Sequence, residues 1–166
     1  MKKPQVIYYN ARAVIERIVN GERMVLVQRR VSDGAATSFE FPGGCLEEDE
    51  TFIDALKREV LEETGLTVTK IYGVESWECE DDIESVKPYS IYQKIQNWTN
   101  SAGERYRSVG VHFKCEADGE PLEKGDDSTE IQWVTREKLR ALLDEPDMFS
   151  YMDRGAAETY LSDLNN

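Results

Sequence analysis

The sequence predicts an α/β protein, in which helices pack on the faces of a mixed β-sheet. Apolar and β-branched residues run through several strand-like segments on either side of a single helical segment at residues 51–64. Helical spacing returns only near the end of the chain, after the last strand-like segment. Strands, a helix, more strands and late helices are typical of a sheet covered by helices. The length of 166 residues suits one domain that spans residues 1–166.

The first strands are delimited by their turns. Asn20-Gly21 is a strong signal for a two-residue hairpin turn between strands. Pro42-Gly43-Gly44 ends the last apolar run before the helix, because proline and glycine interrupt regular structure. We therefore expect strands at residues 6–16, 24–28 and 38–41, and a loop at residues 32–36.

Residues 51–64 form the best-defined helix of the sequence. Thr51 is a suitable N-cap, and Gly65 follows the helix as a C-terminal glycine should. Three apolar residues at helical spacing give the helix a face for the core: Ile53, Leu56 and Val60. We expect this face to lie opposite the carboxylates of the same helix.

The second half of the chain alternates strands and polar loops before two terminal helices. Strands are expected at residues 66–77, 89–98, 106–116 and 131–134, separated by loops at residues 78–87, 99–103 and 118–128. Apolar residues at helical spacing predict the two last helices, at residues 136–143 and 153–164. No internal repeat or low-complexity tract interrupts this order.

The chain is strongly acidic, with 33 acidic against 20 basic residues and a net charge of -13. Such a surface repels a nucleic-acid polymer, whose binding depends on lysine and arginine neutralising phosphates. A small nucleotide accompanied by a metal ion meets a much lower barrier. The charge also serves solubility, which accounts for most of these residues.

The cysteines indicate a reduced compartment. Cys45, Cys79 and Cys115 have no metal-site spacing, and His112 is the single histidine, so a zinc site is not expected. An odd number of cysteines without a signal peptide predicts free thiols in the cytoplasm. No apolar segment is long enough to span a membrane.

The helix carries a cluster of carboxylates. Glu59, Glu62 and Glu63 lie within five residues, and side chains three or four positions apart share a helix face. We expect the three carboxylates to point the same way. Like charges on one face repel unless a positive group lies among them, and a hard divalent cation with oxygen ligands satisfies this arrangement.

The stretch from Gly44 to Leu66 resembles the signature of the Nudix hydrolases. Every fixed position of that signature is filled in order, by Gly44, Glu50, Arg58, Glu59, Val60, Glu62, Glu63, Gly65 and Leu66. The resemblance implies an α/β/α sandwich around the mixed sheet. It also implies Mg²⁺-dependent hydrolysis of a nucleoside diphosphate linked to another moiety, with Mn²⁺ as a possible substitute.

The resemblance assigns roles to residues of the stretch from Gly44 to Leu66, which is called the box from here on. Glu59, Glu62 and Glu63 are the expected metal ligands, joined by a carbonyl of Gly43 or Gly44. Two other box residues support them. Arg58 precedes Glu62 by four residues and is expected to hold its carboxylate, and Glu50 is either a helix-end charge or a supporting ligand.

A general base is needed to take a proton from the attacking water. In proteins of this type the base lies either in the box or on a later loop, where the candidates are Glu123, Asp126, Asp127 and Glu130. The segments that contain Arg29, Arg30 and Glu40 resemble the MutT-type branch, which hydrolyses nucleoside triphosphates. We assign these three residues to substrate binding, with the arginines on phosphates.

Several alternatives remain open at the level of sequence. Aromatic residues that lie in core strands or stack on a base are Trp77, Tyr89, Tyr92, Phe113 and Trp133. A nucleotide sugar, ADP-ribose or another diphosphate is an alternative substrate, although the sequence marks of ADP-ribose, dinucleoside polyphosphate and NADH hydrolases are absent after the box. A catalytically silent nucleotide-binding domain is the alternative from another class, and a homodimer is compatible with the family.

Overall fold

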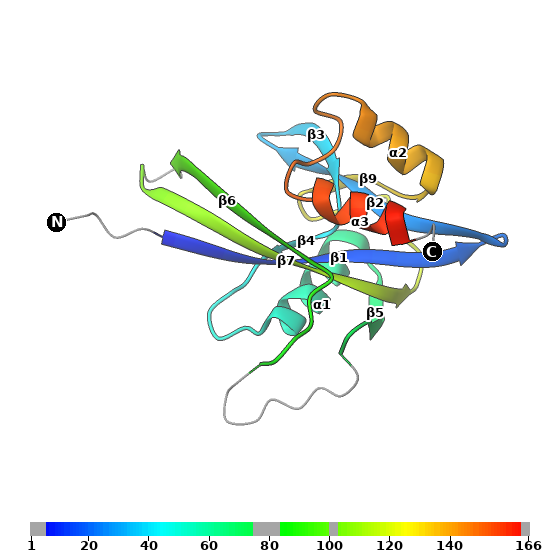
Figure 1. The fold of residues 1–166 in the computed structure, drawn as a ribbon, viewed down its shortest axis with the longest axis horizontal. Coiled ribbons are helices and arrows are strands. Elements are labelled where there is room, and N and C mark those ends of the chain that lie inside the picture. The colour runs from blue at the N-terminus through cyan, green and yellow to red at the C-terminus, as the bar shows by residue number, and fades with distance from the viewer. Residues whose placement is uncertain (1–5, 75–83, 100–102, 164–166) are drawn as a thin grey trace.

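The computed structural model describes residues 6–74, 84–99 and 103–163, and these form nine strands and three helices (Figure 1). The first part contains β1 (Val6–Val19), β2 (Glu22–Ser32), β3 (Ala35–Glu40), β4 (Gly43–Cys45), α1 (Phe52–Thr64) and β5 (Thr67–Ile71). The second part contains β6 (Ser90–Thr99), β7 (Arg105–Asp118), β8 (Lys124–Gly125), β9 (Ser128–Thr135), α2 (Arg136–Asp144) and α3 (Arg154–Asp163).

Strand β1 organises the sheet. It runs parallel to β7 over its first ten residues, antiparallel to β2 at its far end, and antiparallel to the short β4 at its middle. The strand order is β5-β7-β1-β2-β9-β8, with β3 on β2, β4 on β1 and β6 on β7. One parallel pair among antiparallel neighbours makes the sheet mixed, as the order of elements predicts.

Two hydrophobic cores lie on opposite faces of this sheet. Because side chains alternate along a strand, Ala13 of β1 packs in the core that contains α1, and Val14 packs in the core that contains α2 and α3. The helices therefore form layers on both sides of the sheet (Figure 1). This arrangement confirms the predicted α/β/α sandwich.

The box helix α1 has the predicted ends. The Thr51 hydroxyl accepts the Asp54 N–H at 3.1 Å, and Gly65 adopts a left-handed conformation with φ 75° while its N–H donates to the Leu61 carbonyl. The three predicted apolar residues Ile53, Leu56 and Val60 are buried against the sheet.

The turns explain most differences from the predicted strand bounds. Asn20 and Gly21 both have positive φ, as the expected hairpin turn requires. Asp33 and Gly34 do the same, so the predicted loop at residues 32–36 shrinks to a tight turn and β3 begins directly after it. The polar loop at residues 118–128 contains the short β8.

Other differences lie after the box helix. The strand predicted at residues 66–77 ends at Ile71, and Trp77 and Cys79 fall outside the described residues. None of the helices within the described ranges is long and apolar enough to cross a membrane.

Candidate active site

The two glycines of β4 let this strand pack closely against β1 on one side and against α1 on the other. A side chain on Gly43 would overlap the backbone of β1 at the Ala11 carbonyl oxygen, and Gly43 has a φ of 139°. A Cβ on Gly44 would lie 2.5 Å from the carboxylate carbon of Glu59 on α1. The absence of side chains at both positions therefore lets β4 fit between β1 and the box helix.

Arg58 is the centre of an ion-pair cluster on α1. Its guanidinium contacts both oxygens of Glu50 at 2.8 Å, Glu59 at 2.8 Å and Glu62 at 3.1 Å. It also donates to the Cys45 carbonyl at 3.1 Å. The predicted contact between Arg58 and Glu62 is present, and hydrogen bonds from Arg58 lower the pKa of Glu50. Glu50 thus anchors the arginine that faces the other box acids.

Glu63 occupies a different environment from its neighbours. Its side chain is 8% exposed, and one oxygen, Oε2, accepts hydrogen bonds from the Gly43 N–H at 2.8 Å and from the Gln28 side-chain amide at 2.7 Å. Burial raises the pKa of Glu63 to about 7, although these donors and the Arg12 guanidinium oppose the shift. Glu63 is therefore a carboxylate whose ionised form needs positive charge nearby.

The expectation that the three carboxylates point the same way is wrong. Glu62 is exposed and Glu59 is half-buried, and both contact Arg58, while Glu63 turns inward to Gly43. The reason is that helix positions 62 and 63 are about 100° apart, so one faces solvent and the other faces the sheet. Among the described residues, no three histidine, cysteine, aspartate or glutamate side chains converge as a metal site.

The residues present nevertheless fit a divalent cation. The donor set consists of carboxylate oxygens, the ligands that Mg²⁺ prefers. Burial raises the pKa of Glu59 and of Glu63, so both charges lack solvent stabilisation that a cation would replace. The bare backbone at Gly44 leaves room for the Glu59 carboxylate beside β4.

The two adjacent arginines of β2 lie in different surroundings. Arg29 packs its guanidinium 4.8 Å from the Phe39 ring and 3.6 Å from a Glu130 oxygen. Arg30 is exposed, and its charge acts on Glu40 and on Lys94 of β6.

Lys94 is a further cation, and no local pattern in the sequence singles it out. Burial and the nearby positive charge of Arg30 lower the pKa of Lys94. The two cations therefore lie within electrostatic reach of each other, although they come from strands far apart in the sequence. Only the pairing of β6 with β7 and of β7 with β1 brings Lys94 toward the box.

Glu40 is not placed to touch a substrate directly. It is 2% exposed and lies 2.8 Å from the guanidinium of buried Arg12, which also contacts Asp153 at 2.9 Å. This position corrects the assignment of Glu40 to substrate contact, because nearly all of its surface is covered. Glu40 supports the site by holding Arg12, whose charge acts on Glu63.

The loop with the candidate bases packs on the end of α1. The Asp126 N–H donates to the Glu62 carbonyl, and the Ser128 hydroxyl donates to the Glu63 carbonyl at 2.7 Å. Gly125 lies against the Glu63 backbone, where a side chain would collide. The four candidates Glu123, Asp126, Asp127 and Glu130 are all exposed, and Glu130 is directed to Arg29.

The aromatic candidates are mainly structural. Phe113 is fully buried in the core beside α1, so its suggested stacking on a base is excluded. Trp133 packs on the same core with Arg17 4.5 Å above its ring, and the Tyr89 hydroxyl bonds Asp163 at 2.7 Å. Tyr92 lies over Gly110, where a side chain would overlap its ring.

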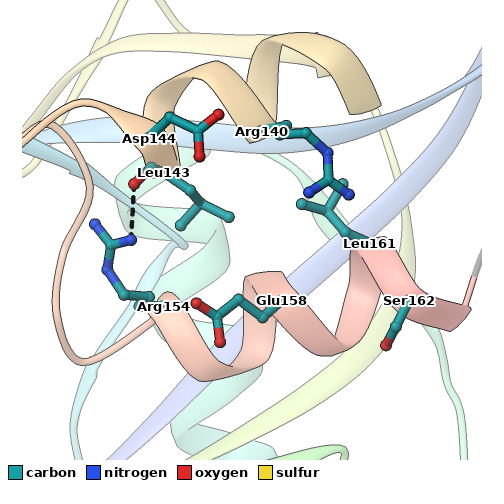
Figure 2. Close-up of a pocket in the computed structure, with 7 residues that line it drawn as sticks. All are labelled: Arg140, Leu143, Asp144, Arg154, Glu158, Leu161 and Ser162. Carbon is teal, nitrogen blue, oxygen red and sulfur yellow. Dashed lines mark hydrogen bonds between the residues drawn. The ribbon is translucent and has the colours of Figure 1, made fainter.

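A separate hollow of about 290 Å³ lies between α2 and α3 (Figure 2). Charged side chains of both signs line it, and Arg154 donates to the Leu143 carbonyl at 2.7 Å across one end. None of its lining residues belongs to the box, so the carboxylate chemistry lies elsewhere.

Comparisons with known proteins identify the family of this chain. The NUDIX domain profile matches residues 9–154. The chain is 25% identical over 147 residues to the nucleoside triphosphatase NudI of Enterobacter sp. (strain 638), covering 87% of this chain and 96% of the relative.

Solved structures show the same fold at low sequence identity. A MutT NUDIX hydrolase from Burkholderia pseudomallei superimposes with a TM-score of 0.62 and 20% identity, covering 93% of this chain and 98% of the other. The NUDIX domain of Shewanella oneidensis NrtR, crystallised with ADP ribose, superimposes with a TM-score of 0.63 and 17% identity, covering 98% of this chain and 90% of the other.

The profile covers most of the chain, and the box residues stand where the fold brings them together around α1 and β4. The chain therefore belongs to the NUDIX family. Within that family it is a Nudix pyrophosphohydrolase, an enzyme that acts on phosphoanhydride bonds.

Proposed function

We propose that this enzyme is a Mg²⁺-dependent pyrophosphohydrolase whose substrate is a nucleoside triphosphate and whose product is a nucleoside monophosphate. The observation that carries the proposal is Glu63, a buried carboxylate that two donors hold at one oxygen, on the same helix as Glu59 and Glu62. A carboxylate that serves only solubility would be exposed and would not be fixed in this way.

In this proposal Glu59, Glu62 and Glu63 hold the cation with a carbonyl of Gly43 or Gly44, which requires the Glu59 and Glu62 side chains to turn away from Arg58. Bound Mg²⁺ neutralises phosphoanhydride charge and makes a coordinated water easier to deprotonate.

The other site residues act on the substrate and on the water. Arg30 and Lys94 bind phosphate oxygens, because the charge of Arg30 acts on Lys94 and the two together offer positive charge to an anionic substrate. Arg29 is a weaker candidate for phosphate contact, since it already pairs with Glu130. An acid on the loop after β7 accepts the proton of the attacking water. Among the candidates on this loop, Asp126 is joined to the box helix by a backbone hydrogen bond to Glu62.

The choice of a nucleoside triphosphate is supported by a relative. NudI is described as a nucleoside triphosphatase, and it is similar to this chain over most of both lengths. ADP-ribose remains the second candidate, because the NrtR domain that shares this fold was crystallised with ADP ribose.

The test is a hydrolysis panel with Mg²⁺ and purified protein. Nucleoside triphosphates, nucleotide sugars, ADP-ribose and dinucleotides are incubated separately, and the products are resolved by ion exchange. We expect turnover of a triphosphate, and we expect Glu62→Gln and Glu63→Gln to lower it by about 100-fold or more. Glu158→Gln, on the exposed face of α3, is the matched control and should retain full activity.

Turnover of ADP-ribose alone would replace the triphosphate with the second candidate. An inactive protein across the whole panel would overturn the proposed catalysis and favour a nucleotide-binding role.

A further inference from the structure

Gln28 is a buried polar residue whose position the box does not explain. It lies in β2 opposite Glu40 of β3 and is 0% exposed. Glutamine is rarely buried so completely, because its amide loses hydrogen bonds to water unless the protein replaces them.

The Gln28 amide replaces only one of these bonds. Its Nε2 donates to Glu63 Oε2 at 2.7 Å, while its Oε1 is buried without a hydrogen-bond partner in the described part of the chain. The orientation of the amide follows from Glu63. The same Glu63 oxygen accepts the Gly43 N–H at 2.8 Å, so it is an acceptor and the group that faces it must be a donor.

An unpartnered buried carbonyl oxygen costs free energy, and the hydrogen bond from Nε2 to the Glu63 carboxylate offsets only part of that cost. An apolar side chain of similar volume, such as methionine, would fill the same space without that cost. Stability alone therefore does not account for Gln28. Buried polar residues whose hydrogen bonds are not all satisfied tend to lie at functional sites.

The consequence for Glu63 is asymmetric. Both donors, Gln28 and Gly43, bind Oε2, and Oε1 has no hydrogen-bond partner among the described residues. Both donors are also held by strands, since Gln28 pairs with Glu40 and Gly43 pairs with Arg12. The sheet thus fixes the rotation of a carboxylate that belongs to the helix.

We propose that Gln28 is a positioning residue for Glu63: together with the Gly43 N–H it holds one carboxylate oxygen and leaves the other for a divalent cation. The inference rests on the proposed function, in which Glu63 is a metal ligand. A ligand restrained in this way loses less conformational freedom on binding, so the cation is bound more tightly.

The experiment measures Mn²⁺ binding without substrate. Free Mn²⁺ is followed by electron paramagnetic resonance while the metal is titrated into wild type, Gln28→Met, Gln28→Leu and Glu63→Gln. The control is Gln93→Met, a matched change on an exposed residue of β6. Thermal unfolding of each metal-free protein is recorded in parallel.

We expect Gln28→Met and Gln28→Leu to weaken Mn²⁺ binding by about 10-fold or more. We expect the Tm of metal-free Gln28→Met to stay close to that of wild type, because the unpartnered oxygen is gone while buried Glu63 loses one of its two donors. The control should match wild type in both measurements.

Each contrary result has a distinct meaning. Wild-type affinity in both Gln28 variants, with weakened binding in Glu63→Gln, would overturn the role of Gln28 and leave the metal site intact. A parallel loss of affinity and metal-free Tm in both Gln28 variants would make the role structural and also overturn it. Unchanged binding in Glu63→Gln would instead overturn the metal assignment in the proposed function.

Discussion

At the scale of single residues, the two glycines of β4 avoid different clashes, one with backbone and one with a side chain. Gly43 has a φ of 139° and faces backbone of β1, which cannot move without distorting the central strand. Gly44 faces the carboxylate of Glu59, the far end of a flexible side chain. The same substitution at adjacent positions should therefore separate folding from catalysis.

We expect Gly43→Ala to lower the free energy of unfolding by about 3 kcal/mol or more, because it combines unfavourable φ with backbone overlap. We expect Gly44→Ala to unfold like wild type but to lose activity by about 100-fold, because the Glu59 carboxylate must move. Urea unfolding and steady-state kinetics check the pair. Equal stability of the two variants would contradict this explanation.

How far single residues could be predicted depends on their distance along the chain from their partners. The box was recognisable because its residues lie within one continuous segment. Gln28 and Lys94 have no such local signal, since their relation to the box exists only after β2, β6 and β7 pair around β1. Glu40 looked like a substrate residue because its buried partner Arg12 belongs to another strand.

At the scale of elements, the box helix is capped from two directions. The sequence pattern indicates Thr51 as the N-cap, and the structure has it there. Glu84 is a second cap, which no local pattern indicates. The Glu84 carboxylate accepts the N–H of Phe52 at 2.9 Å and of Ile53 at 3.1 Å. Capping residues are expected next to their helix, so a cap supplied by a later loop leaves no local pattern.

We expect Glu84→Ala to lower the free energy of unfolding by about 1–2 kcal/mol, because two N–H groups lose an acceptor and the helix end loses a favourable charge. Glu120→Ala, on an exposed loop, is the control and should have no measurable effect. Chemical denaturation at neutral pH measures both. A Glu84→Ala protein as stable as wild type would show that the cap adds nothing to the free energy of unfolding.

At the scale of the whole molecule, a buried charged group joins the C-terminal helix layer to the sheet. Asp153, directly before α3, lies 2.9 Å from Arg12 of β1 and 2.7 Å from the His112 ring of β7. Its other oxygen accepts the Phe41 N–H at 3.1 Å. Residues from the start, middle and end of the chain thus meet at one carboxylate, which no local sequence pattern predicts.

This network should make the protein sensitive to acid. Burial disfavours the charge on Asp153, but Arg12 and His112 outweigh it and hold the pKa of Asp153 below its ordinary value. An acid with a lowered folded pKa adds stability above its unfolded pKa of about 4, and that stability is lost as pH falls below this value. We therefore expect part of the acid unfolding of wild type to come from protonation of Asp153.

We expect Asp153→Asn to lower the free energy of unfolding at pH 7 by about 3–5 kcal/mol, because Arg12 keeps its buried charge with one partner fewer. The difference from wild type should shrink below about pH 4, because Asp153 then takes up a proton when the wild type unfolds. Asp144→Asn, exposed on α2, is the control and should follow wild type at every pH. Urea unfolding measured at several pH values decides the matter. A difference between Asp153→Asn and wild type that is the same at pH 3 and pH 7 would show that packing, and not charge, holds α3 to the sheet.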